Sequence, residues 1–196
     1  MAPDDPPDLD PVLTPDYGYA WSVAYDASVN TVVAGSYHSG QYQYDVGSFP
    51  VDDGYGSARV FVRTSNSTLD WTQQAILIAD DGAGNDYSGY TVDVSGDTAF
   101  VGAIGPSGVA RYFVFVRDGS GSWSQQAMLG SEGDPYADDG RVPRVKVEGD
   151  VAVVERGFGR KGKVFVYERT GGTNWALEHT LEASDGMEGD YFGASE

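Results

Sequence analysis

Short apolar runs separated by glycine- and aspartate-rich turns cover most of the chain, and residues 90–129 show the pattern most clearly. Alternation in the first run of this segment puts Tyr90, Val92 and Val94 on one face of a strand. The second run is almost continuously apolar, which is typical of a strand buried on both faces. The four predicted strands are YTVDV (90–94), TAFVGA (98–103), ARYFVFVR (110–117) and WSQQAML (123–129).

The pattern favours an all-β fold. No stretch of about 11 or more residues shows the periodicity of an amphipathic helix. Turn signals instead recur roughly every 8–12 residues, as they do in proteins built from short antiparallel strands.

A repeat of 52 residues organises these strands. Trp71, Trp123 and Trp175 are spaced by this interval. Self-similarity at about 40–50 residues, with four strands in each unit, predicts a β-propeller whose blades bury their apolar faces against each other. We therefore expect the repeated tryptophan and phenylalanine rings to pack between blades, where burying one ring is worth about 2–3 kcal/mol. Three further sets keep the same interval: Leu77, Leu129 and Leu181; Phe61, Phe113 and Phe165; Val62, Val114 and Val166.

The repeat divides the chain into a leader and three full units. Residues 1–15 contain five prolines and four aspartates and are predicted to be a disordered or extended leader. An insertion of roughly residues 37–56 in the first unit must be a surface loop. The units are 16–85, 86–137 and 138–189, and a fourth begins at 190–196.

Three blades do not close a propeller, which typically has about four to eight. An open array would expose two apolar faces, which soluble monomers avoid. Three hypotheses follow: the chain is a fragment of a longer propeller, copies self-associate to close the ring, or a partner chain covers the open faces.

The charge of the chain restricts its partners. There are 12 basic and 30 acidic residues, so the formal net charge is −18. Such a surface repels the phosphate backbone, so we expect no nucleic-acid binding. The acidity either binds divalent cations or keeps the protein soluble in salty water. There is no cysteine, no apolar run of about 18 residues that could span a membrane, and no signal peptide at the start of this sequence.

Several segments resemble FG-GAP repeats, the repeats of integrin α-subunit propellers, and are closest to the bacterial and marine algal type. The resemblance covers about residues 16–196 and implies an extracellular or cell-surface propeller for adhesion or ligand binding, often with calcium. The segments that carry it are GSARVFVR (56–63), WTQQAIL (71–77), ADDGAGNDYSGYTVDVSGDTAFVGAI (79–104) and ASDGMEGDYFGAS (183–195).

The sequence departs from the family pattern in both halves of the repeat motif. The Phe-Gly half is intact at 192–193 but is Ser-Gly at 88–89, and the Gly-Ala-Pro half is lost at 155–156. In integrins the calcium loop lies between the first two strands of a blade. Here the turns at 95–97 and 148–150 hold too few oxygens for calcium, so that site does not carry over.

Acidic residues gather instead at the joints between units, where glycines let a loop fold tightly. Carboxylates and backbone carbonyls are the ligands that calcium (Ca2+) prefers, so these joints are candidate metal sites. The alternative is that the same residues form turns that cap strand ends. The candidates are Asp80, Asp81, Asn85, Asp86, Asp134, Asp138, Asp185, Glu188 and Asp190, with Asp45, Asp52 and Asp53 of the insertion as a second set.

The insertion is rich in tyrosine, glycine and serine, a composition typical of recognition loops. Its tyrosines are candidates for binding a protein or glycan ligand, unless the loop only packs its own aromatic residues. The candidates are Tyr37, Tyr42, Tyr44 and Tyr55.

Catalysis has little support in the sequence. His179 lies in a predicted strand, His38 has no obvious partner, and no nucleophile elbow, zinc motif or phosphate loop occurs. We therefore expect a non-enzymatic interaction or adhesion module that binds through its blade loops, with calcium as a candidate cofactor. The alternatives are a structural subunit of a larger assembly and a non-catalytic part of a secreted hydrolase.

Overall fold

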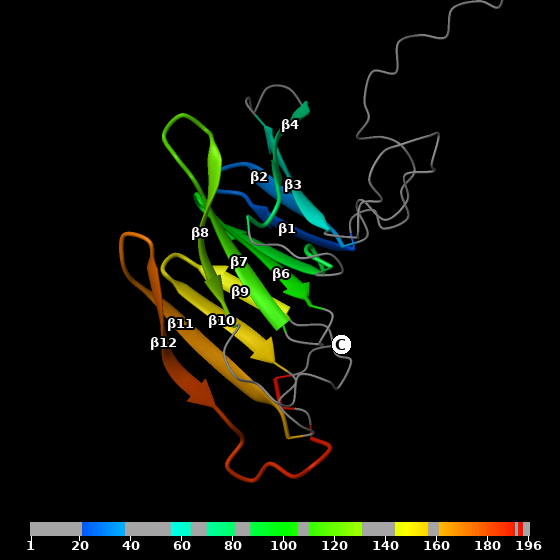
Figure 1. Ribbon diagram of the computed structural model, residues 1–196, viewed down its shortest axis with the longest axis vertical. Helices are drawn as coiled ribbons and strands as arrows, with labels where there is room; N and C mark the ends of the chain where they lie inside the picture. The colour runs from blue at the N-terminus through cyan, green and yellow to red at the C-terminus, as the bar shows by residue number, and fades with distance from the viewer. Residues whose placement is uncertain are drawn as a thin grey trace, which may run out of the picture.

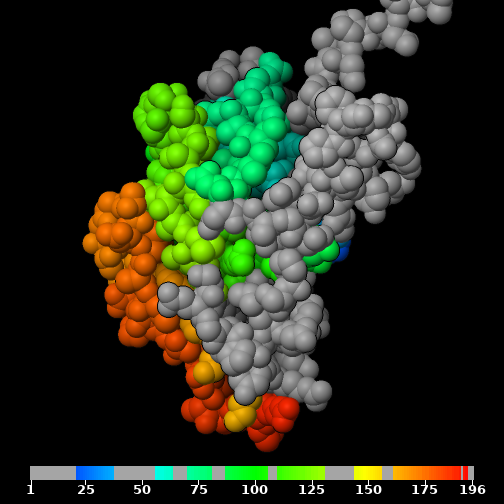
Figure 2. Space-filling view, viewed as in Figure 1, coloured from blue at the N-terminus to red at the C-terminus, as the bar shows by residue number. Residues whose placement is uncertain are grey.

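The computed structural model forms three four-stranded antiparallel sheets that follow one another along the molecule (Figures 1 and 2). It describes residues 21–37, 56–63, 70–80, 87–105, 110–130, 144–156, 161–190 and 192–193. These ranges contain strands and turns and no α-helix. The predicted all-β fold, a partial propeller, is confirmed.

Each sheet is a blade whose strands pair in sequence order. Blade 1 comprises β1 (Ser22–Asp26), β2 (Thr31–Ser36), β3 (Ser57–Arg63) and β4 (Trp71–Leu77). Blade 2 comprises β5 (Thr91–Ser95), β6 (Thr98–Ile104), β7 (Ala110–Arg117) and β8 (Trp123–Leu129). Blade 3 comprises β9 (Arg144–Glu148), β10 (Val151–Arg156), β11 (Lys163–Gly171) and β12 (Asn174–Leu181).

Local turn chemistry fixes the hairpins of blade 2. Ser95 pairs with Thr98 across a two-residue turn, and Gly96 has a φ of 58°, which a residue with a side chain adopts less readily. Between β7 and β8, the Asp118 carboxylate accepts hydrogen bonds from the backbone N–H groups of Ser120 and Ser122. These bonds, with one from the Ser120 hydroxyl as the largest cause, lower the pKa of Asp118.

In β3 of blade 1, the residues that occupy equivalent positions in the fold are not the ones that stand 52 residues apart in the sequence. An arginine on the third strand pairs with the repeated tryptophan in every blade, as Arg63–Trp71, Arg117–Trp123 and Arg169–Trp175. Counted from this pair, Phe61 corresponds to Phe115 rather than to Phe113. Val62 corresponds to Val116 in the same way. The cause is the hairpin between Arg63 and Trp71, which is two residues longer than its counterpart in blade 2.

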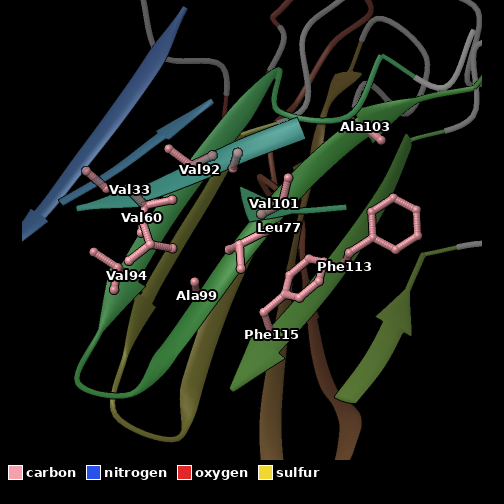
Figure 3. Close-up of a cluster of buried hydrophobic side chains, with 12 residues drawn as sticks. Val33, Val60, Leu77, Val92, Val94, Ala99, Val101, Ala103, Phe113 and Phe115 are labelled. Carbon is pink, nitrogen blue, oxygen red and sulfur yellow. The ribbon is translucent and has the colours of Figure 1, made fainter. Parts of the chain in front are cut away.

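Two apolar cores lie between the blades rather than within them. The first core joins blades 1 and 2, where Val33, Val60 and Leu77 meet Val101 and Phe113 (Figure 3). The second core joins blades 2 and 3 and is built from Phe100, Tyr112, Val114, Leu129, Val145, Val147, Ala152, Val154, Phe165 and Tyr167. Because β6, β7 and β8 contribute to both cores, blade 2 is buried on both faces.

The repeated tryptophans pack toward the preceding blade where there is one. Trp123 packs against the first core, and its indole N–H donates to Gln74 Oε1 of blade 1 at 2.9 Å. Trp175 meets Phe100 of blade 2 edge to face, with ring centroids 5.1 Å apart. Trp71 is the exception to the expected packing, because it lies on the outer side of blade 1 and is 39% exposed.

The outer blades expose apolar side chains, as expected of an open array. Val23 and Tyr25 are exposed on blade 1. Val151, Val153 and Leu181 are exposed on blade 3. Within the ranges that the structure describes, no helix has the length and apolar character needed to span a membrane.

Candidate ligand-binding site

The antiparallel topology sorts the connections of each blade to two ends. In blades 1 and 2 the first and third strands begin, and the second and fourth end, at what we call the joint end, from which the connections between blades and the 37–56 insertion depart. The opposite, or turn, end carries the tight hairpin turns, which lie on the left of Figure 1 for blades 2 and 3. Of the predicted residues that are described, Tyr37 follows the end of β2 and Asp80 the end of β4, so both lie at the joint end.

Four aromatic side chains meet at the joint end between blades 1 and 2, and we call them the aromatic cluster: Trp21, Tyr37, Tyr87 and Tyr90. Tyr37 stacks on Tyr90 with centroids 4.4 Å apart and an interplanar angle of 29°. Trp21 stands edge-on to both, at 5.1 Å from Tyr37 and 5.8 Å from Tyr90. Tyr87 lies 6.3 Å from Tyr37. The three edge-on or tilted pairs lie within the range of about 4.5–7 Å for favourable aromatic contacts, and the stacked pair lies at its short limit.

Backbone contacts bring these four rings together. Trp21 N–H donates to Gly35 O at 3.0 Å, which ties the start of β1 to the end of β2. The N–H groups of Gly89 and Tyr90 both donate to Gly102 O, each at 3.0 Å, which ties the entry of blade 2 to β6.

Two glycines allow the strand ends to approach closely. A Cβ atom at Gly35 would lie 2.1 Å from Gly89 O, and Gly89 itself has a φ of 95°. No side chain fits at either position without moving backbone. Gly35 stands two residues before Tyr37 and Gly89 directly before Tyr90, so this approach sets the stacking of the two rings.

The aromatic cluster presents an uncharged surface on a strongly acidic protein. Partial burial is the largest cause that raises the pKa of Tyr90 above its usual 10.0, and the neighbouring phenols of Tyr37 and Tyr87 raise it further. The phenol is therefore neutral at physiological pH. Trp21 is 57% exposed, so part of the aromatic surface remains accessible.

Of the predicted ligand-binding tyrosines, only Tyr37 falls in the described ranges, and it lies in the aromatic cluster. Tyr42, Tyr44 and Tyr55 lie outside the described residues. Trp21, Tyr87 and Tyr90 were not among the residues predicted from the sequence to form a site. A usable signal existed, because Trp21 and Tyr90 precede the first strand of their blades at equivalent positions.

The described acidic candidates are engaged in turns or directed to the surface. Asp190 Oδ2 accepts from Met187 N–H at 2.6 Å, and Asp190 N–H returns a bond to Met187 O at 3.1 Å. Asp190 thus forms a turn, which was the alternative to metal binding for the acidic residues at the joints between units. Asp185 and Glu188 are exposed beside it, and Asp80 N–H donates to Gln125 Oε1 at 2.9 Å.

The remaining metal candidates, Asp81, Asn85, Asp86, Asp134, Asp138, Asp45, Asp52 and Asp53, lie outside the described residues. Among the residues that are described, no three acidic or histidine side chains converge to hold a metal ion. Calcium binding therefore stays a prediction.

The acidic residues of the hairpin turns stand where integrins have their calcium loop, and they form ion pairs with arginines. Asp97 Oδ1 lies 2.7 Å from Arg117, and Asp150 Oδ1 lies 3.2 Å from Arg169. Each arginine also lies over the repeated tryptophan of its blade, with the guanidinium carbon 5.3 Å from the Trp123 ring and 4.8 Å from the Trp175 ring. These carboxylates therefore serve the packing of the blade.

His179, the histidine that the structure describes, adds no catalytic group to this site. His179 is exposed on β12, as expected, and His38 lies outside the described residues. A polar hollow of about 340 Å³ lies near the end of blade 3. Its Glu182 carboxylate is bound to Lys163 at 2.6 Å. The hollow is lined by Lys161, Gly162, Glu182, Ala183, Ser184 and Gly186.

Comparison with known proteins identifies a repeat of known type. Residues 71–115 match the family model of the FG-GAP repeat, from β4 to within β7. The resemblance seen in the sequence is thus confirmed over this segment. No curated protein matches the chain.

Two solved structures are similar to the chain in fold. The crystal structure of Saccharomyces cerevisiae Sqt1 is 10% identical with a TM-score of 0.48, over 85% of this chain and 36% of that one. Sqt1 from Chaetomium thermophilum is 14% identical with a TM-score of 0.47, over 86% of this chain and 38% of that one. The chain spans less than two-fifths of the length of either protein.

Proposed function

Because the chain carries an FG-GAP repeat on a partial propeller, we propose that it is a non-enzymatic interaction module that binds a protein or a glycan at its joint end. The aromatic cluster is the observation that carries the proposal. FG-GAP repeats suggest a propeller-type interaction module, and by analogy with that family we place the module outside the cell or at its surface.

The proposal rests on the contact properties of exposed tryptophan and tyrosine rings. They offer large, rigid contact surfaces with a polar edge, and they dominate the energetically important positions of interfaces. Stacking on a sugar ring or on a partner's side chain at Trp21 requires little ordering, because Tyr37 and Tyr90 already hold that ring edge-on. The cluster is also uncharged, so a neutral glycan or an apolar peptide segment approaches it without opposing the net negative charge.

The test is a glycan-array screen of the purified chain, followed by titration of the best glycan. We expect Trp21→Ala to weaken binding at least tenfold, because the exposed ring supplies contact area. Leu177→Ala is the control, because Leu177 is 50% exposed on blade 3, away from the cluster. Glycan binding that survives Trp21→Ala unchanged would refute the cluster as the site, and a protein ligand would be tested with the same pair of variants.

Calcium binding at the joints is a second, more specific part of the proposal. It is supported by the acidic candidates at the joints, which flank the same end of the blades as the aromatic cluster. Ligand binding to the folded state raises stability by about 2.7 kcal/mol at a concentration 100 times the Kd. We expect millimolar calcium to raise the melting temperature. Equal melting curves with calcium and with a chelator would leave the acidity as adaptation to salt.

A second candidate function, a structural subunit of a larger assembly, is favoured by the exposed apolar faces of blades 1 and 3. These faces are where a closing partner would sit. The array would be closed by self-association or by a partner chain.

A further inference from the structure

The polar hollow near the end of blade 3 is walled by two segments that the sheet brings side by side. Lys161 and Gly162 stand directly before β11, and the residues 182–186 directly follow β12. Because Val164 of β11 pairs with Leu181 of β12, the two segments meet at the end of blade 3 that corresponds to the joint end of blades 1 and 2. The volume of about 340 Å³ lies at the lower end of the range for small-molecule sites, so the hollow suits a ligand of one ring.

Backbone hydrogen bonds hold both walls of the hollow in place. Gly186 N–H donates to Ala183 O at 3.1 Å, which closes a turn in the second wall. Phe192 N–H donates to Lys161 O at 2.8 Å, which ties the first wall to the segment that follows the turn at Met187 to Asp190. The hollow is therefore shaped by main chain, and a ligand does not have to order it on binding.

One positive charge in the hollow has no counter-ion among the described residues. Two charged side chains line the hollow, Lys161 and Glu182. Glu182 Oε1 lies 2.6 Å from Lys163 Nζ, so a lysine outside the lining neutralises this carboxylate. Lys161 is exposed and forms no ion pair within the ranges that the structure describes. The hollow thus presents an uncompensated ammonium group on a chain whose formal net charge is −18.

A carboxylate flanked by hydroxyl groups complements this lining. The Lys161 ammonium group can donate charge-assisted hydrogen bonds to a carboxylate. The Ser184 hydroxyl and the second carboxylate oxygen of Glu182 add a donor and an acceptor for neutral hydroxyl groups. Distant carboxylates of the chain are screened over about 8 Å at physiological salt. Asp185 is closer in sequence, but it is exposed to solvent and does not line the hollow.

Met187 and Phe192 add apolar surface next to the polar lining. Met187 directly follows Gly186 of the lining and is 69% exposed. Phe192, whose N–H is bonded to Lys161 O, is 37% exposed. A sugar ring has C–H faces as well as hydroxyl groups and uses both kinds of surface. An inorganic anion or an acidic peptide side chain would use the ammonium group alone.

The geometry points to a binding site for an acidic sugar, a pyranose ring that carries a carboxylate, in the hollow of blade 3. The carboxylate pairs with Lys161, the ring hydroxyl groups bond to Ser184 and Glu182, and a C–H face of the ring contacts Phe192. This site is separate from the aromatic cluster, which lies between blades 1 and 2. The inference goes beyond ligand binding at that cluster and stands whether or not a glycan binds there.

Two matched pairs of monosaccharides test the site: glucuronate against glucose, and galacturonate against galactose. The members of a pair differ only in having a carboxylate or a hydroxymethyl group on the ring. Chemical-shift titration of the ¹⁵N-labelled chain measures each Kd and identifies the amides that respond. We expect at least one uronate to bind about tenfold more tightly than its neutral counterpart, and to shift the amides of the residues 161–163 and 182–186.

Variants of one lysine test its role in this preference. Lys161→Gln should bring the uronate to within about twofold of the neutral sugar, whereas Lys161→Arg should keep the preference because the positive charge remains. Gln73→Glu is the matched control: it makes the net charge one unit more negative, as Lys161→Gln does, at an exposed position of β4 in blade 1. It should leave the Kd for the uronate within about twofold of wild type.

Several results would overturn the inference. They are the absence of binding by both uronates, equal binding within each pair, shifted amides that lie elsewhere, and equal effects of Lys161→Gln and Gln73→Glu. Glutarate, an acid without a sugar ring, should bind about fivefold more weakly than the uronate; equal binding would show an anion site without sugar recognition and would also overturn the inference. Trp21→Ala should leave the uronate titration unchanged, and Lys161→Gln should leave binding at the aromatic cluster unchanged, so the two proposals fail separately.

Discussion

Replacing Gly35 with alanine tests whether the joint between blades 1 and 2 depends on one close backbone approach. The added Cβ would lie 2.1 Å from Gly89 O, 2.9 Å from the Gly89 carbonyl carbon and 3.0 Å from a methyl group of Val92. Two of these three atoms belong to backbone, which has no rotamer by which to move away. The end of β2 and the entry of blade 2 must therefore separate by about 1 Å to restore ordinary contact.

The size of the effect follows from that separation. Overpacking a well-packed interior costs about 1–3 kcal/mol, and the upper part of this range applies because the clash is with backbone. We expect a loss of about 2–3 kcal/mol in the free energy of unfolding. For a chain of this length that corresponds to a fall of roughly 4–12 °C in melting temperature. Gly119→Ala is the matched control, because nothing lies within 4 Å of its added Cβ. It should stay within about 0.5 kcal/mol of wild type.

Urea denaturation gives the free energies, and near-ultraviolet circular dichroism reports the aromatic cluster. The Gly35→Ala variant should lose dichroism near 280 nm, since Tyr37 and Tyr90 stack at 4.4 Å only while the strand ends stay close. The reasoning is refuted if Gly35→Ala unfolds at the same urea concentration as Gly119→Ala and keeps the wild-type spectrum.

Three further predictions concern the core and the titrating groups. Phe100→Ala should cost about 3–5 kcal/mol in urea denaturation because the ring is fully buried against Trp175, whereas the exposed Leu177→Ala should cost little. The pKa of Asp26 lies below 3.8, mainly because its carboxylate accepts a hydrogen bond from the Ser28 hydroxyl and then because it accepts one from Gly96 N–H. The stability that these bonds supply is present above pH 3.8 and is lost as the pH falls through the folded pKa. In Asp26→Asn the free energy of unfolding should therefore change less over this acid range than in wild type. The raised pKa of Tyr90 contributes stability that is present below pH 10.0 and lost as the pH rises through the folded pKa, and Tyr90→Phe should remove one step above pH 10.0 from the tyrosinate absorbance at 295 nm.

The strands were predictable because their signal is local. Alternation within residues 90–94 and the turn at Gly96 depend only on neighbours in sequence, and the structure has β5 and β6 at those places. The spacing of the tryptophans likewise predicted which rings face another blade, with Trp71 as an exception because no described blade covers the outer side of blade 1.

The register of β3 and the make-up of the aromatic cluster could not be predicted in the same way. The interval between Phe61 and Phe113 matches the repeat, yet strand pairing is decided by cross-strand contacts, and the longer hairpin after Arg63 shifts them by two residues. Tyr37 was a candidate from the composition of its loop. Its stacking partner Tyr90 is 53 residues away, and the contact exists because two glycine backbones touch, which no periodicity encodes.

The aromatic cluster and the first joint are one thermodynamic unit. Trp21 and Tyr37 belong to blade 1, whereas Tyr87 and Tyr90 belong to the entry of blade 2, so the cluster exists only while the two blades are packed. A ligand that contacts both pairs binds the closed joint and not the open one, and it therefore stabilises the joint by an amount set by its concentration relative to its Kd. By the same linkage, any change that loosens the joint lowers the affinity for that ligand without touching it. Gly35→Ala should thus weaken ligand binding even though the added methyl group lies outside the aromatic surface.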